Sequence, residues 1–104
     1  MSTFDERQRG FEAKFAHDEE MQFRARARRN KLLGLWAAEL LGRKGADADA
    51  YALEVVKADF EEPGEEDVFR KVSGDLGQRA DETTIRTKMA ALLATAKEQL
   101  LREG

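Results

Sequence analysis

The sequence predicts an all-α protein, a four-helix bundle with a long first helix and a flexible or partly helical N-terminal extension. Apolar residues recur at helical spacing in four segments, and no strand-like alternation runs for more than four residues. Charged residues make up 38% of the 104-residue chain, which has one proline and no cysteine. Helices joined by short loops bury their apolar faces on one another, so a compact bundle is the expected architecture.

The first predicted helix spans residues 11–42 and ends at glycine, with Gly42 or Gly45 in the left-handed cap position. Only its last part, residues 32–41, is apolar enough to join the bundle. The residues of this part that share one face are Leu33, Trp36 and Leu40. Residues 16–31 are mostly charged or alanine, and we expect them to stay outside any core.

The second predicted helix starts with Asp47 as N-cap and continues to about Glu61. Pro63 and Gly64 then break the pattern, because proline lacks a backbone donor and glycine frees the turn. The apolar positions of this helix are Tyr51, Ala52, Val55, Val56 and Phe60.

A third helix of about ten to twelve residues follows, and Gly74 and Gly77 leave its end open. The fourth helix starts at Asp81, which can cap its Thr-rich first turn. The apolar positions are Val68, Phe69, Val72 and Leu76 in the third helix, and Ile85, Met89, Leu92, Leu93, Ala96 and Leu100 in the fourth.

Three phenylalanines lie near the N-terminus, and on a helix Phe11 and Phe15 fall within about 20° of Phe4. The charged residues 16–31 separate them from the bundle, so we expect a partner to bind them in a groove. The alternative is a fifth small helix that folds back on the bundle at Gly10. The proposed division is a segment 1–19 and a bundle domain 20–104. The charges expected to assist the phenylalanines include Arg7, Lys14, Asp18 and Glu19.

Charge is unevenly distributed, with a net +3 over residues 1–44 and −6 over residues 45–104. The basic run "RARARRNK" can suggest nucleic-acid binding. The acidic remainder and the i/i+2 spacing of the arginines favour a solvated or partner-facing helix instead. No apolar run reaches the length of a membrane span, so the expected location is the cytoplasm.

Other chemistry has little support in the sequence. His17 is the only histidine, and its acidic neighbours would allow a pH-sensing role. One histidine with scattered carboxylates predicts no metal site and no catalytic set. The stretch "GRKG" lacks the spacing of a phosphate loop.

Several stretches resemble the zeta subunit, the ATPase inhibitor of alphaproteobacterial F-type ATP synthases. The most specific are "FEAKFAHDEE", "RRNKLLGLWAAE" and "VVKADFEE". The resemblance implies a four-helix bundle whose N-terminal segment enters the cleft between a catalytic and a non-catalytic subunit of the ATPase head. There it would block rotary ATP hydrolysis.

On this resemblance, Phe4, Phe11, Lys14 and Phe15 lie in the inhibitory segment. The chain would be a non-enzyme, a monomer when free, and peripheral to the inner membrane when bound to the ATP synthase. It would require no cofactor, although the resemblance also implies weak binding of ATP or ADP in the bundle. A nucleotide-sensing helical module is therefore the alternative function.

Overall fold

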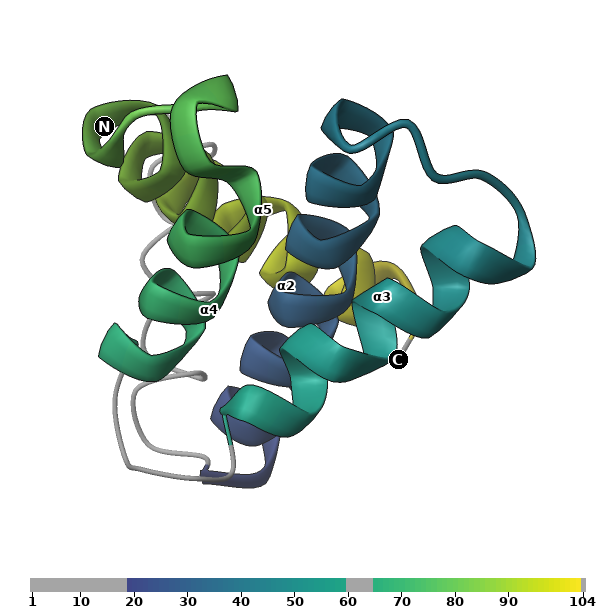
Figure 1. Cartoon of the computed structure of the whole chain (residues 1–104). Helices are drawn as coiled ribbons and strands as arrows, with labels where there is room; N and C mark the ends of the chain where they lie inside the picture. The colour runs from purple at the N-terminus through teal and green to yellow at the C-terminus, as the bar shows by residue number, and fades with distance from the viewer. Residues whose placement is uncertain (1–18, 60–64, 104) are drawn as a thin grey trace.

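The computed structural model describes residues 19–59 and 65–103 (Figure 1). These residues contain no strand and confirm the predicted all-α bundle. Their elements are α2 (Glu19–Leu40), α3 (Ala46–Ala58), α4 (Glu66–Leu76), the 3-10 turn η1 (Gly77–Arg79) and α5 (Glu82–Glu103).

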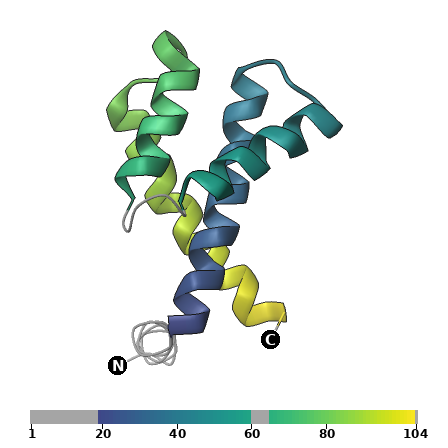
Figure 2. The same ribbon diagram turned by 60° about the horizontal axis from the view of Figure 1, so that its bottom comes forward.

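The two long helices, α2 and α5, have 22 residues each and cross one another (Figure 2). The shorter helix α3 packs across the C-terminal half of α2, and α4 lies beside the N-terminal half of α5. Because α3 and α4 cover the same end of the crossing, the start of α2 and the end of α5 extend beyond them. The described residues measure 44 × 25 × 25 Å.

The main core lies where all four helices meet. Each helix contributes the apolar positions that its period places on one face. The buried residues of this cluster are Leu33, Ala37, Ala38, Tyr51, Val55, Val68, Val72, Leu76, Ile85 and Met89. Trp36, Phe69 and Leu92 are partly buried against it.

Gly34 allows α2 and α3 to approach closely. A Cβ atom placed on Gly34 would lie 2.5 Å from Cα of Ala52 and 3.1 Å from its Cβ. No side chain fits at that distance from a backbone atom, so the crossing depends on glycine at this position.

The first helix ends at Leu40, and Gly42, two residues later, has a φ of 76°. The Gly42 amide donates to the Glu39 carbonyl (3.1 Å), and the Arg43 amide donates to the Ala38 carbonyl (2.9 Å). This pattern is a Schellman cap, in which a left-handed glycine satisfies the last carbonyls of a helix. Gly42, rather than Gly45, therefore caps α2.

The predicted N-cap of the second helix is wrong. Gly45, with a φ of 56°, precedes α3, and Asp47 lies inside the first turn. The left-handed glycine turns the chain two residues earlier than the aspartate would. The negative charges of Asp47 and Asp49 in this turn still interact favourably with the positive end of the helix dipole.

The predicted cap of the last helix is confirmed, because the Thr84 amide donates to Asp81 Oδ1 at 2.8 Å. The third helix ends at Leu76, where the 3-10 turn begins.

Most of the apolar positions predicted for the second to fourth helices are buried. Four of them are partly buried, namely Val56, Phe69, Leu92 and Leu93, and Phe60 lies outside the described residues.

Two predictions for the first helix are wrong. Leu40 is 40% exposed, because the small residues Ala37 and Ala38 take the buried positions beside the close helix crossing. Part of the charged stretch 16–31 is also buried, namely Ala25, Arg29 and Asn30. The reason is that neighbouring helices cover this stretch, since Leu100 of α5 packs on Ala25 and Arg29 reaches Glu65 at the start of α4.

Candidate functional site

Most of the residues predicted to bind a partner lie outside the described part of the chain. Glu19 alone is described, and it is the exposed first residue of α2. The others, together with His17, are Phe4, Arg7, Phe11, Lys14, Phe15 and Asp18. The described residues therefore show how the bundle holds the helix that follows the candidate segment.

The N-terminal half of α2 packs on the C-terminal half of α5. Ala25 and Leu100 are buried together, 1% and 9% exposed, in a second apolar cluster that is separate from the main core. Met21, Leu93 and Leu101 are partly buried against this pair. One small residue and one leucine bury much less area than the main core, so this contact is the weaker one.

An ion pair supports the same contact. Arg28 donates from Nη1 to Glu103 Oε1 and from Nη2 to Glu103 Oε2, the second at 2.8 Å. Arg28 Nη1 also reaches Gln99 Oε1 at 3.4 Å. The hydrogen bonds from Arg28 hold the pKa of Glu103 below its usual range. A bidentate arginine fixes both distance and orientation, so it sets the angle between the two helices here.

Four arginines of the basic run "RARARRNK" pair with carboxylates. The pairs are Arg24–Glu20 (2.7 Å), Arg26–Asp59 (3.6 Å), Arg28–Glu103 and Arg29–Glu65 (3.0 Å). Paired arginines have less free charge with which to neutralise phosphates. The pairing therefore favours a helix packed within its own protein over a nucleic-acid interface.

Arg29 and Asn30 form a buried polar pair in the middle of α2, and both are 0% exposed. Arg29 Nε donates to Asn30 Oδ1 at 2.7 Å, and Arg29 Nη1 donates to Glu65 at the start of α4. Arg29 Nη2 and Asn30 Nδ2 find no hydrogen-bond partner within the described residues. This pair joins α2 to α4 at the boundary between the two apolar clusters.

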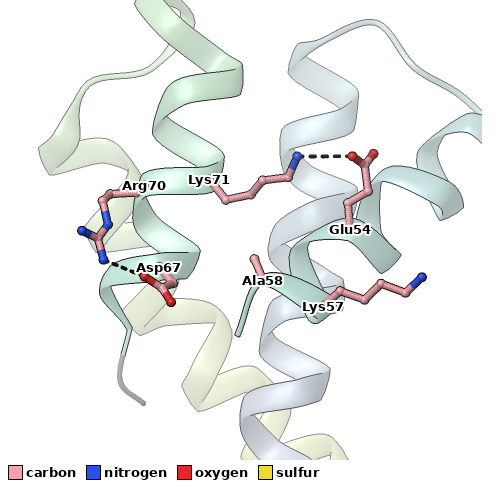
Figure 3. Close-up of a pocket in the computed structure, with 6 residues that line it drawn as sticks. All are labelled: Glu54, Lys57, Ala58, Asp67, Arg70 and Lys71. Atoms are coloured by element: carbon pink, nitrogen blue, oxygen red, sulfur yellow. Dashed lines mark hydrogen bonds and ion pairs between the residues drawn. The ribbon is translucent and has the colours of Figure 1, made fainter. Parts of the chain in front are cut away.

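An open groove of about 520 Å³ separates the end of α3 from the start of α4 (Figure 3). Lys71 reaches across it to Glu54 at 3.3 Å, whereas Arg70 turns to Asp67 at 2.6 Å and Lys57 points away. The cations of the groove thus do not converge on one point. A phosphate bound here would have to compete with Glu54 for Lys71.

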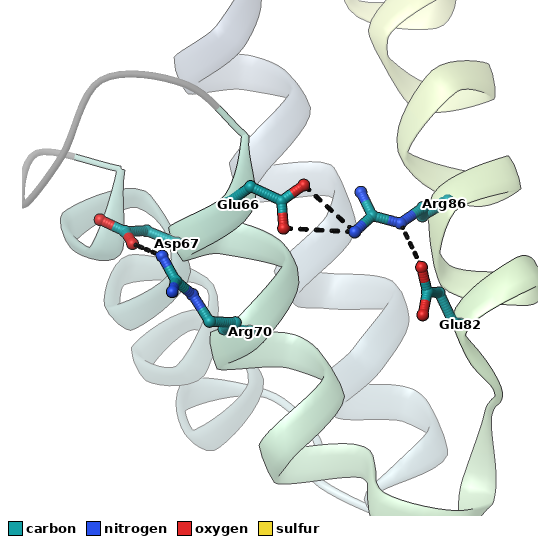
Figure 4. Close-up of polar contacts among 5 residues, drawn as sticks. All are labelled: Glu66, Asp67, Arg70, Glu82 and Arg86. Atoms are coloured by element: carbon teal, nitrogen blue, oxygen red, sulfur yellow. Dashed lines mark hydrogen bonds and ion pairs between the residues drawn. The ribbon is translucent and has the colours of Figure 1, made fainter.

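A second group of polar contacts joins α4 to α5 (Figure 4). Arg86 pairs with Glu66 at 3.1 Å and with Glu82 at 2.9 Å, and its guanidinium lies 4.0 Å from the centre of the Phe69 ring. These groups are exposed or partly exposed. They orient α4 on α5. Because Arg86 is paired with both carboxylates, this group gives no support for a binding site or a catalytic site.

Tyr51 is buried under two cations, Arg43 at 5.2 Å and Lys71 at 5.3 Å from the ring centre. Its hydroxyl donates to Asp75 Oδ2 at 2.9 Å, and Lys71 also contacts this carboxylate, at 2.8 Å. Burial, reinforced by the bond to Asp75, raises the pKa of Tyr51. Burial acts to raise the pKa of Asp75, but the bonds from Lys71 and Tyr51 outweigh it and the pKa is lowered.

Within residues 19–59 and 65–103, no three His, Cys, Asp or Glu side chains are grouped so that they could hold a metal ion. Nor does any helix in this part of the chain have the length and hydropathy of a membrane span.

The ion pair between Arg28 and Glu103 was not predicted from the sequence, although the packing of the two helix ends around it was predictable. A usable signal was present, because the apolar stripe of the fourth helix continues to Leu100 and Leu101. A helix this much longer than its neighbours must bury its far end on the other long helix.

Comparison with known proteins places the chain in a family. A sequence profile described as ATPase inhibitor subunit zeta matches residues 1–99. A solved structure described as "Solution NMR structure of the protein" is 61% identical, with a TM-score of 0.75, and the match covers 81% of this chain and 99% of that one. No protein with a curated description matches. The chain belongs to the family of the ATPase inhibitor subunit zeta.

Proposed function

We propose that this chain blocks ATP hydrolysis by the F-type ATP synthase when residues 1–19 insert between a catalytic and a non-catalytic subunit of its head. The observation that carries the proposal is that the family match begins at residue 1 and includes the whole segment. The chain then acts as a regulatory subunit without a reaction of its own, and as a monomer when free.

The fold supports this role through the position of α2. From Glu19, the first described residue, this helix continues without a break into the main core. A segment joined to such a helix is attached to a rigid body, which reduces the freedom lost on binding. Residues 19–59 and 65–103 bury two apolar clusters among themselves, and we propose that the bundle folds without the segment.

Deletion of residues 1–19 tests the proposal. We expect the shortened chain to keep its helical circular dichroism spectrum and to lose inhibition of ATP hydrolysis by the isolated head. A shortened chain that still inhibits as the full chain does would refute insertion of this segment.

Single substitutions sharpen the test. Burial of a phenylalanine contributes about 1.5–3 kcal/mol, so Phe11→Ala should raise the concentration for half-inhibition about tenfold or more. The matched control is Leu53→Ala, because Leu53 is 52% exposed on α3 and lies outside residues 1–19 in the sequence. The control should inhibit normally. Equal losses in both variants would indicate a general effect of apolar surface.

A second candidate function is weak sensing of adenine nucleotide, and the groove between α3 and α4 is the observation that favours it. The groove is open and carries Lys57, Arg70 and Lys71 on its walls. Because Lys71 and Arg70 are paired with carboxylates, we propose that a nucleotide binds only weakly.

A titration followed by amide chemical shifts tests this site. ATP should give saturable shifts at residues 54–58 and 67–71, and Lys71→Gln should abolish them. The control Lys88→Gln, whose lysine lies over Trp36 on another face, should leave them unchanged. Shifts that do not saturate, or that inorganic phosphate reproduces at equal concentration, would count against nucleotide sensing.

A further inference from the structure

The last turns of α5 hold the part of α2 that lies nearest the proposed inhibitory segment. Figure 2 shows the beginning of α2 and the end of α5 at the same end of the molecule, beyond α3 and α4. Leu100 packs on Ala25, and Glu103 pairs with Arg28. This contact lies within the first ten described residues of α2.

The two parts of the contact differ in kind. The apolar part is small, because within the described residues its buried members are Ala25 and Leu100, with Met21, Leu93 and Leu101 partly buried beside them. The polar part is directional, because Arg28 binds both oxygens of Glu103. A weak apolar contact with a directional ion pair can open without unfolding the main core, because Leu33 and the residues around it belong to a separate cluster.

The contact also lies at the edge of what the family match covers. The match ends at residue 99, so Leu100 and Glu103 lie beyond it. Arg28 and Ala25 lie within it. The family assignment therefore does not itself cover the partner residues on α5.

We propose that the C-terminal end of α5 is a clamp that positions the inhibitory segment. Leu100 and Glu103 act as positioning residues, because they fix the direction in which residues 19–28 leave the bundle. The clamp rests on the proposed function of residues 1–19. Without the clamp, the first turns of α2 lose their tertiary support and fray from the end, since helices in proteins gain most of their stability from packing.

Opening of these turns should lower the apparent affinity for the ATPase head. When only a fraction of the molecules holds the helix in the binding-competent direction, the apparent dissociation constant rises by the inverse of that fraction. The clamp thus controls the strength of inhibition without touching the partner.

The first test compares Glu103→Gln with Glu98→Gln. Glu98 pairs with Arg102 on the same helix, so its substitution removes the same charge and no contact between helices. Removal of a partly exposed ion pair changes an equilibrium by about two- to fivefold, so Glu103→Gln should raise the concentration for half-inhibition by that factor. Glu98→Gln should leave it unchanged.

Amide hydrogen exchange supplies a readout that does not depend on activity. Glu103→Gln and Leu100→Ala should speed exchange of residues 20–28 and leave α3 unchanged. The charge-swapped double variant Arg28→Glu/Glu103→Arg should restore both protection and inhibition.

Faster exchange with unchanged inhibition would overturn the positioning role, and so would unchanged exchange. A wild-type chain that does not inhibit would overturn the proposed function together with the clamp. The wild-type measurement therefore distinguishes the two failures.

Discussion

The two halves of α2 are held in different ways. Its C-terminal half, with Leu33, Ala37 and Ala38, lies in a core to which all four helices contribute. Its N-terminal half packs mainly on α5, through Ala25 and through charged pairs. The C-terminal half of this continuous helix thus contributes most to the stability of the fold. The contacts of its N-terminal half with α5 set the direction of the helix.

Matched leucine truncations would test this contrast, and they should have the largest effects. Leu33 is 0% exposed in the main core, whereas Leu100 is 9% exposed in the small cluster. Leu33→Ala should lower the free energy of unfolding by about 3–4 kcal/mol and Leu100→Ala by about 1–2 kcal/mol. Urea unfolding followed by circular dichroism measures both. Equal losses would show that the halves are equally supported.

A pair of glycine substitutions should have the next largest effect. Gly34→Ala places a Cβ 2.5 Å from Cα of Ala52 and should destabilise the fold by about 2 kcal/mol, because overpacking forces the helices apart. Gly74→Ala meets nothing within 4 Å and should stabilise α4 by about 0.5–1 kcal/mol. In thermal unfolding, the midpoint temperature should fall for Gly34→Ala and rise for Gly74→Ala. A neutral Gly34→Ala would mean that the crossing is not closely packed.

The hydroxyl of Tyr51 gives a pH test of the main core. Its raised pKa means that folding favours the protonated form, so this contribution is complete below about pH 10 and is lost as the pH rises above it. We expect a loss of about 1 kcal/mol between pH 10 and 11. Tyr51 is the only tyrosine, so absorbance at 295 nm reports its ionisation directly.

The control for this titration is Tyr51→Phe, which should remove its share of the loss in stability. Ionisation of Tyr51 at an ordinary pH in the folded protein would contradict the buried bond to Asp75.

Substitutions of the buried arginine between the two halves should have the smallest effect. Arg29→Met removes a charge and an unpaired Nη2 but keeps most of the side-chain volume. Glu65 is 51% exposed, so water can take the place of Arg29 there, but buried Asn30 Oδ1 loses its donor and we expect a loss of about 1 kcal/mol. Arg29→Ala leaves a cavity and should cost more. Urea unfolding measures both variants. A large loss of unfolding free energy in Arg29→Met would show that the polar contacts of Arg29 stabilise the packing between the two apolar clusters.

The sequence predicted the parts of the fold that depend on one helix at a time. The spacing of Val68, Val72 and Leu76 was enough for α4, and the side chain of Asp81 was enough for the start of α5. What it could not predict depends on two helices together. Leu40 is exposed because α3 crosses close at Gly34, and Ala25 is buried because α5 extends that far.

The candidate site divides in the same way. The aromatic stripe of Phe4, Phe11 and Phe15 follows from spacing alone and stays a prediction, since it lies outside the described residues. The pair between Arg28 and Glu103 joins residues 75 positions apart, which no local pattern reveals.

The unbroken course of α2 also has a mechanical consequence. A rotary enzyme that turns against residues 1–19 would pull or push on Glu19, and the helix would carry this load along its axis. The load would then reach the crossing of Gly34 with Ala52, where the backbones are too close to slide past each other. The close crossing would resist sliding of α2 against α3. Gly34, which allows the crossing, would then help to keep the bundle in place while the rotary enzyme pushes on residues 1–19.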